Sequence, residues 1–177
     1  MIVKRVAILV CLSLVAGCST IGTKIPGVNN FDQVEPGLLR GAQPSSGGFK
    51  TLADRGVKTV IDLRDDARHD EKQRVTELGM NYVWLPSNAA FSSPDQASRF
   101  LHFVQSSPRP IFVHCKAGCD RTGQNIAVYR IVMNGWTRQQ AIDELYAHGY
   151  HWMLFPNIEH FLKTFQPIAP GATASNN

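Results

Sequence analysis

IFVHCKAGCDRTG, residues 111–123, is the stretch that decides how the rest of the chain is interpreted. Its apolar start predicts a short buried strand over residues 111–113, and the apolar pattern after Thr122 predicts a helix over residues 122–134. A loop directly ahead of a helix can turn its backbone N–H groups toward an anion, and the helix dipole adds positive charge there. Cys115 opens this loop, where such a field favours the nucleophilic thiolate form. The stretch therefore predicts a cradle for an oxyanion with a sulfur at its floor.

Two further residues of the loop fit the same purpose. Arg121 follows Cys115 after five intervening residues, and its planar guanidinium can bind two oxygens of one phosphate group. Gly118 allows a backbone conformation that a side chain would hinder. The loop therefore combines a nucleophile, a cation and flexible backbone in one short segment.

The pattern outside the loop predicts the fold class. Predicted strands cover residues 37–41, 57–63, 82–85 and 111–113, and the first of them is expected at an edge of the sheet. Predicted helices cover residues 49–55, 66–78, 122–134, 137–147 and 156–165, and Ser93 opens one more as its N-cap. Thr137 and Gln140 have the spacing of a capping box at the start of the helix over residues 137–147. Strands that alternate with helices predict an α/β domain with a central, mostly parallel sheet flanked by helices.

The first eighteen residues are typical of an export signal. Lys4 and Arg5 precede an almost unbroken apolar run, and the small residues Ala16 and Gly17 stand directly before Cys18. This ending resembles a bacterial lipobox, in which the signal is cut off before the cysteine and the thiol carries a diacylglycerol. We expect a lipoprotein on the periplasmic face of the outer membrane, because a residue other than Asp follows the cysteine. An ordinary cleaved signal is the alternative.

The chain therefore divides into four parts. Residues 1–17 are the predicted signal peptide, and residues 18–30, which are polar and rich in Gly, Pro and Asn, are the lipid anchor and linker. Residues 31–165 form the predicted domain, and residues 166–177 form a flexible tail. The formal net charge of +4 falls to +2 when the signal is removed. That balance is too even for a broad basic face, so we expect no nucleic-acid partner. We also expect a monomeric protein.

The order His114, Cys115, five residues, Arg121 and Thr122 resembles the signature of the cysteine-based protein tyrosine phosphatases, in particular their small dual-specificity branch. Residues 37–44 and 56–64 are also similar to segments that precede the loop in that branch. The resemblance implies a phosphatase without metal or other cofactor. It also implies a phosphorylated protein substrate, with phosphotyrosine first and phosphoserine, phosphothreonine or a phosphoinositide second.

The resemblance also implies roles for individual residues. Cys115 would form the phosphocysteine, Arg121 would bind the phosphoryl oxygens, and His114 would support the loop. The hydroxyl group of Thr122 would stabilise the sulfur when it leaves. Substrate would be bound along the rest of the loop, by Lys116, Ala117, Gly118, Cys119 and Thr122.

The general acid is a separate question, because an alkyl or aryl oxygen leaves faster when it is protonated. The branch carries this Asp on a loop ahead of the cysteine, but residues 85–91 of this chain contain no carboxylate. Asp120, directly before Arg121, is the favoured candidate, since myotubularin-type lipid phosphatases and some bacterial tyrosine phosphatases have an acid there. Asp95 is the alternative, although an Asp in a first helical turn is common for dipole reasons.

Several alternatives remain open at this stage. Cys119 could form a disulfide with Cys115 that inactivates the enzyme, or could be an ordinary small side chain. Asp62 and Arg64 could support the loop or form a surface ion pair. His148, His151 and His160 have no accompanying ligand pattern, so no metal site is predicted. Rival functions are a phosphate-binding module without activity and a thiol redox protein.

Overall fold

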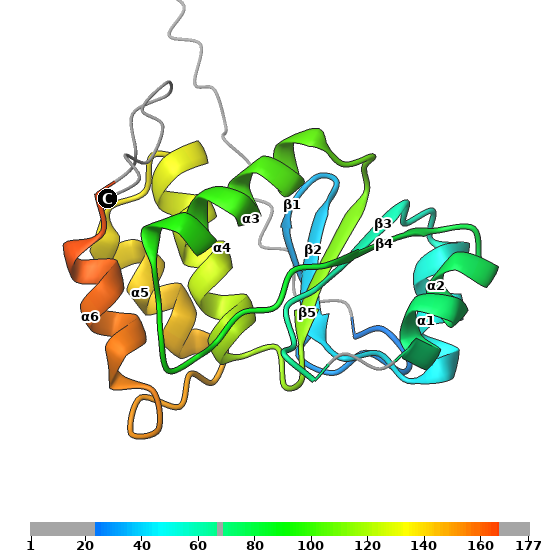
Figure 1. Cartoon of the computed structure of the whole chain (residues 1–177), viewed down its shortest axis with the longest axis horizontal. Helices are drawn as coiled ribbons and strands as arrows, with labels where there is room; N and C mark the ends of the chain where they lie inside the picture. Colours follow the sequence, from blue (N-terminus) through cyan, green and yellow to red (C-terminus); the bar gives the residue numbers. More distant parts are fainter. Residues whose placement is uncertain (1–23, 67–68, 167–177) are drawn as a thin grey trace, which may run out of the picture.

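The computed structural model of the protein describes residues 24–66 and 69–166. A five-stranded sheet forms the centre of this part, with strand order β1-β2-β5-β3-β4 (Figure 1). The strands are β1 (Asp32–Glu35), β2 (Leu38–Ala42), β3 (Thr59–Asp62), β4 (Asn81–Trp84) and β5 (Ile111–Cys115). All neighbouring pairs are parallel except β1 with β2. The predicted α/β class with a mostly parallel sheet is confirmed.

Helices cover both faces of the sheet (Figure 1). They are α1 (Ser46–Asp54), α2 (His69–Glu77), α3 (Pro94–Ser106), α4 (Asp120–Met133), α5 (Arg138–Ala147) and α6 (Pro156–Thr164). One core lies between the sheet and the helices α1 and α2, and a second lies between the sheet and the helices α3 and α4. A third cluster joins α4 to α5 and α6, so α4 is covered on two sides. The loop ahead of α4 is therefore attached to the most enclosed helix of the domain.

The predicted strand over residues 37–41 corresponds to β2, but it is not at an edge. The short strand β1 pairs with it on the outer side, and β5 pairs with it on the other. No strand was predicted at β1, because its residues DQVE include a single apolar side chain, Val34. The antiparallel hairpin depends on backbone hydrogen bonding to β2, which leaves little trace in the local pattern.

Two helix starts follow the predicted chemistry. The side chain of Ser93 accepts a hydrogen bond from the backbone N–H of Gln96 at the start of α3. Thr137 and Gln140 form a reciprocal capping box at the start of α5. These local contacts satisfy backbone donors that a helix start leaves unpaired, which is why they could be predicted from sequence.

The segment before β1 is folded, which differs from the prediction of a linker that extends to residue 30. Ile25 and Val28 are buried against α1 and the sheet, and the carbonyl of Gly27 accepts a hydrogen bond from Ser45 N. The two apolar side chains fill a gap that only the assembled sheet creates. The predicted signal peptide, Cys18 and residues 167–177 of the tail lie outside the described residues. Within the described residues, no helix has the length and apolar character needed to cross a bilayer.

Candidate active site

The loop predicted to bind an anion lies at the carboxyl end of β5. Cys115 is the last residue of that strand, and α4 begins at Asp120, two residues earlier than predicted. Residues 116–119 therefore make the whole connection between strand and helix. Such a short connection holds the Cys115 side chain, which is only 4% exposed, at the N-terminal end of α4.

The carbonyl groups of residues 115–118 are all held by donors outside the loop. Four hydrogen bonds do this, each accepted by a carbonyl oxygen. His114 Nδ1 donates to Cys115 O (3.2 Å), Gln43 N to Lys116 O (3.2 Å), Asn30 Nδ2 to Ala117 O (3.3 Å) and Arg40 Nη2 to Gly118 O (2.9 Å). In a trans peptide the N–H group points away from the carbonyl before it. The N–H groups of residues 116–119 consequently turn to the inner side of the loop. Among the described residues none of these four groups has a hydrogen-bond acceptor, so they form a cradle for an anion.

Gly118 makes this geometry possible. Its φ is +75°, a conformation that side chains disfavour. A Cβ atom at this position would also lie 2.5 Å from the backbone carbon of Gly41 on β2. The loop therefore packs directly on the backbone of β2, and no other residue fits there.

Arg40 of β2 lies behind the loop and is 1% exposed. Only its Nη2 atom has a partner, the carbonyl of Gly118, while its Nε and Nη1 atoms have none among the described residues. Burial lowers the pKa of Arg40 to about 10, against the opposing effect of nearby Glu144 and Asp32. A guanidinium with that pKa is still charged at neutral pH, so it adds positive charge behind the anion cradle.

Arg121, the predicted phosphate ligand, is in contact with a carboxylate. Its Nη2 atom lies 3.1 Å from Oδ1 of Asp65, which follows β3 and is 54% exposed. The Arg121 side chain is itself partly exposed. A bound phosphate would compete with Asp65 for this guanidinium.

Asp120 lies at the wall of the site and is engaged by His151 from the connection between α5 and α6. Its Oδ1 atom accepts a hydrogen bond from the backbone N–H of His151 at 2.9 Å. The ring nitrogen Nδ1 of His151 lies 3.2 Å from Oδ1 and 3.0 Å from Oδ2. Asp95, the alternative acid, is exposed in the first turn of α3.

A cavity of about 320 Å³ joins these groups. The loop contributes Cys115, Lys116, Ala117, Asp120 and Arg121 to its lining. The other side consists of Ala89, His151, Leu154 and Phe155. Asp95 is not part of the lining, so the structure brings Asp120 together with Cys115 and leaves Asp95 apart.

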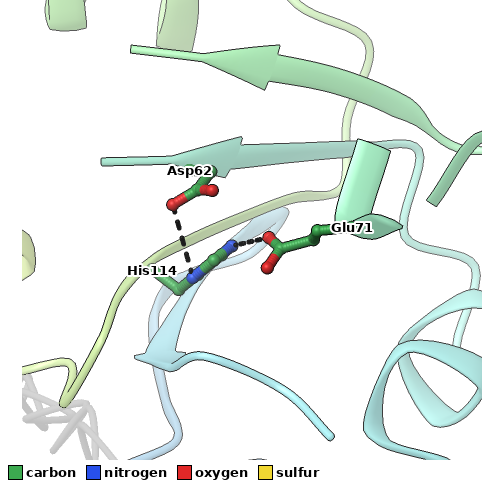
Figure 2. Close-up of side chains that lie close together, drawn as sticks. All are labelled: Asp62, Glu71 and His114. Carbon is green, nitrogen blue, oxygen red and sulfur yellow. Dashed lines mark ion pairs between the residues drawn. The ribbon is translucent and has the colours of Figure 1, made fainter. Parts of the chain in front are cut away.

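His114 supports the loop from within a buried ionic network (Figure 2). Its Nε2 atom lies 2.9 Å from Oε1 of Glu71 on α2, and its Nδ1 atom lies 3.9 Å from Oδ1 of Asp62 at the end of β3. Arg64 joins the two carboxylates, with Nη2 at 2.7 Å from Asp62 Oδ2 and at 2.6 Å from Glu71 Oε2. All four side chains are at most 3% exposed. Of the two readings of Asp62 and Arg64, the structure therefore favours support of the loop.

The network also bears on the question of a metal. In the described part of the chain, one group of side chains converges as metal ligands would. It consists of Asp62, Glu71 and His114. Burial alone would raise the pKa of Asp62, but hydrogen bonds from Arg64 and the charge of His114 lower it below its usual range. Arg64 already contacts an oxygen of each carboxylate, and Tyr82 and Gln43 donate hydrogen bonds to the same two groups. The oxygens that a cation would need are therefore engaged by donors, and these residues do not fit a cation.

Thr122 and Cys119 complete the loop. Thr122 is fully buried, and its hydroxyl oxygen has no partner among the described residues, so its proton is available to a neighbouring acceptor.

Cys115 and Cys119 are free thiols. Cys119 Sγ accepts a hydrogen bond from Asn30 and contacts the Ala117 carbonyl. Burial and the charges of Asp120 and Cys115 raise the pKa of the Cys119 thiol.

Four residues of the site were not found from sequence: Asn30, Arg40, Asp65 and His151. Arg40 lies in a predicted strand, and the sequence pattern there indicates a basic side chain that faces solvent. His151 was considered only as a metal ligand. Their role depends on contacts between residues far apart in the chain, and no local spacing predicts such contacts.

Comparison with known proteins agrees with the geometry of the loop. The family described as "DSP-PTPase phosphatase fused to NAD+ Kinase" matches residues 25–154. The chain belongs to this family. The predicted kinship with the dual-specificity and tyrosine phosphatases is thereby confirmed, and the match begins within the folded segment ahead of β1.

Individual relatives extend this result. The dual specificity protein phosphatase TpbA of Pseudomonas aeruginosa is 32% identical over 127 residues, which are 71% of this chain and 56% of TpbA. The phosphatidylglycerophosphatase and protein-tyrosine phosphatase 1 of Mus musculus is 22% identical over 156 residues, 82% of this chain and 81% of that protein. A crystal structure of TpbA in complex with pTyr shares the fold, with a TM-score of 0.65 at 23% identity, over 80% of this chain and 92% of that one. The chain thus spans little more than half the length of TpbA.

Proposed function

We propose that the protein is a phosphatase that hydrolyses phosphate monoesters through a phosphocysteine on Cys115. The observation that carries this proposal is the loop whose carbonyl groups are all held outward, which leaves its N–H groups facing inward. Arg121 and the buried charge of Arg40 add to the same positive field. Inward N–H groups with cations beside a sulfur suit a tetrahedral oxyanion.

The reaction follows from these positions. The Cys115 sulfur attacks phosphorus, and the bond from phosphorus to the leaving oxygen breaks while that oxygen takes a proton from the Asp120 side of the cavity. Water then attacks the phosphocysteine, the sulfur–phosphorus bond breaks, and inorganic phosphate leaves. The free hydroxyl of Thr122 can donate to the departing sulfur, as the sequence hypothesis requires. No step calls for a metal or another cofactor.

The leading substrate is phosphotyrosine in a protein. Ala89, Leu154 and Phe155 form an apolar wall of the cavity, which suits an aromatic ring. The complex of TpbA with pTyr supports the same choice. We further propose, on the sequence alone, an exported monomer held at the periplasmic face of the outer membrane by a lipid on Cys18.

The direct test compares the full chain with its Cys115→Ser variant on p-nitrophenyl phosphate and on a phosphotyrosine peptide. We expect the substitution to lower kcat by more than about a thousandfold, because it removes the nucleophile. A wild-type protein that binds phosphate without hydrolysing either substrate would be a binding module. Equal activity of the two proteins would also reject the proposal. A thiol redox protein would lack this phosphatase activity, and Arg121→Ala would leave its thiol oxidation unchanged.

A lipid phosphate is the second candidate substrate, because one side of the cavity is apolar and exposed. Trp152, Met153 and Leu154 are 54%, 75% and 70% exposed, and Leu154 lines the cavity. Lys116 supplies a cation at the same opening. Such a surface suits a phosphoinositide headgroup at a bilayer. Rates on phosphoinositide vesicles and on a phosphotyrosine peptide decide between the two, and Trp152→Ser should slow only the vesicle reaction if the lipid is a substrate.

A further inference from the structure

We propose that His151 is the residue that protonates the leaving oxygen, and that Asp120 holds the His151 ring in place. This inference rests on the proposed phosphatase function and assigns the proton donor within it. It replaces the expectation that Asp120 alone is the acid with a pair of residues from α4 and from the connection between α5 and α6.

The contacts of Asp120 are the first argument. Both oxygens of its carboxyl group contact His151. Oδ1 accepts from the backbone N–H of His151 and lies near the ring nitrogen Nδ1, and Oδ2 lies near the same Nδ1 atom. A carboxyl group with both oxygens directed at His151 is oriented toward that residue, and the more exposed His151 ring is better placed to meet a leaving oxygen. The Asp120 carboxylate is well placed to fix the ring and to balance its positive charge.

The position of His151 is the second argument. Since Nδ1 is directed at Asp120, the other ring nitrogen, Nε2, is at the opposite side of the ring. Among the described residues Nε2 has no partner, and the side chain is 49% exposed. His151 lines the cavity together with Cys115 and Arg121, so a substrate in that cavity can reach Nε2.

No carboxylate competes for this task in the loop that usually carries the acid. Asn88 has its Oδ1 bonded to the backbone N–H of Ala90, and an amide cannot act as an acid. Asp65 contacts Arg121 and does not line the cavity. His151 is therefore the proton donor that the arrangement offers beside Asp120.

The proton transfers balance over the two steps. In the first step the Nε2–H of the imidazolium gives its proton to the leaving oxygen as that oxygen separates from phosphorus, and the ring becomes neutral with Nδ1–H still bonded to Asp120. In the second step the neutral Nε2 takes a proton from the attacking water. The sulfur leaves with the electron pair of its bond to phosphorus, and the imidazolium is restored.

The experiment measures kcat/KM of the full chain on two aryl phosphates, p-nitrophenyl phosphate with a good leaving group and phenyl phosphate with a poor one. This parameter reports the step in which the ester bond breaks, and only the poor leaving group depends on a proton donor. We expect His151→Gln to lower kcat/KM about a hundredfold on phenyl phosphate and only a few-fold on p-nitrophenyl phosphate. Asp120→Asn should show the same selectivity. The kcat/KM of the double variant on phenyl phosphate should be no lower than that of the less active single variant.

His160→Gln is the matched control, since His160 is exposed on α6 and does not line the cavity. Three results would overturn the inference: equal losses of His151→Gln on both substrates, a selective loss for Asp120→Asn alone, or additive losses in the double variant. Failure of the proposed function looks different, because the wild-type protein would then hydrolyse neither substrate.

Discussion

The two sides of the loop differ in how their charged groups are held. On the inner side Asp62, Arg64, Glu71 and His114 are buried and in contact with one another, and Arg64 is hydrogen-bonded to both carboxylates. At the opening of the cavity Arg121 contacts Asp65, whose side chain is more than half exposed. Buried groups without access to water need permanent partners, whereas exposed partners can be exchanged at small cost. The inner network therefore acts as a frame, and the outer contacts are those that a substrate can replace.

The largest effect should come from breaking the inner network. Arg64→Ala leaves the carboxylates of Asp62 and Glu71 buried without their cation, which we expect to lower the free energy of unfolding by about 3–5 kcal/mol. Urea unfolding followed by circular dichroism measures this loss. Lys50→Ala, which breaks the exposed pair with Asp54, is the control and should change stability by less than about 0.5 kcal/mol. Similar values for both would mean that the network is not a frame.

Arg40→Met removes the charge behind the loop together with the hydrogen bond to the Gly118 carbonyl. Glu144 and Asp32 offset part of the Arg40 charge. With a net contribution of about 1–2 kcal/mol, we expect vanadate to bind about tenfold more weakly. Stability should change little, because two of the three guanidinium nitrogens have no partner to lose. Inhibition by vanadate and thermal unfolding test the two parts. Arg109→Met, which removes a guanidinium paired with Glu35, should leave vanadate binding unaltered.

His148, at the C-terminal end of α5, predicts a pH effect. Burial and the nearby Arg40 lower the pKa of His148, despite Asp32 at 3.3 Å. The folded protein therefore favours the neutral ring, and the unfolded chain binds the proton more readily. Stability from this group is present above about pH 6.5 and decreases as the pH falls below it. The free energy of unfolding of His148→Gln should fall less than that of wild type between about pH 7 and about pH 5. An equal slope would contradict this assignment.

The smallest effect is expected at the opening. Asp65→Asn removes the charge that competes with phosphate for Arg121, and exposed pairs contribute about 0.2–1 kcal/mol. Inorganic phosphate should consequently inhibit the variant up to about fivefold more strongly than wild type. Asp54→Asn, at the exposed pair on α1, is the matched control. Weaker inhibition of the Asp65 variant would mean that Asp65 helps to position Arg121 instead of competing for it.

Much of the fold could be predicted because it depends on local patterns. The apolar residues of β3 and β5, the capping residues Ser93 and Thr137, and the loop around Cys115 carry their meaning within a few neighbouring positions. The strand β1 and the folded segment with Ile25 and Val28 could not be predicted in this way. Both form only when a distant surface is present to bond or cover them.

The candidate site divides along the same line. The amino-acid sequence by itself predicted the loop and the proposed roles of Cys115, Gly118 and Arg121, because these residues lie within seven consecutive positions between an apolar strand and a helix. Only the tertiary structure decided which groups surround them. Arg40 comes from β2, Asp65 from the end of β3, and His151 from the connection between α5 and α6. Parallel strands bring segments far apart in the chain to one edge of the sheet, and contacts across that edge depend on packing, which no local spacing encodes.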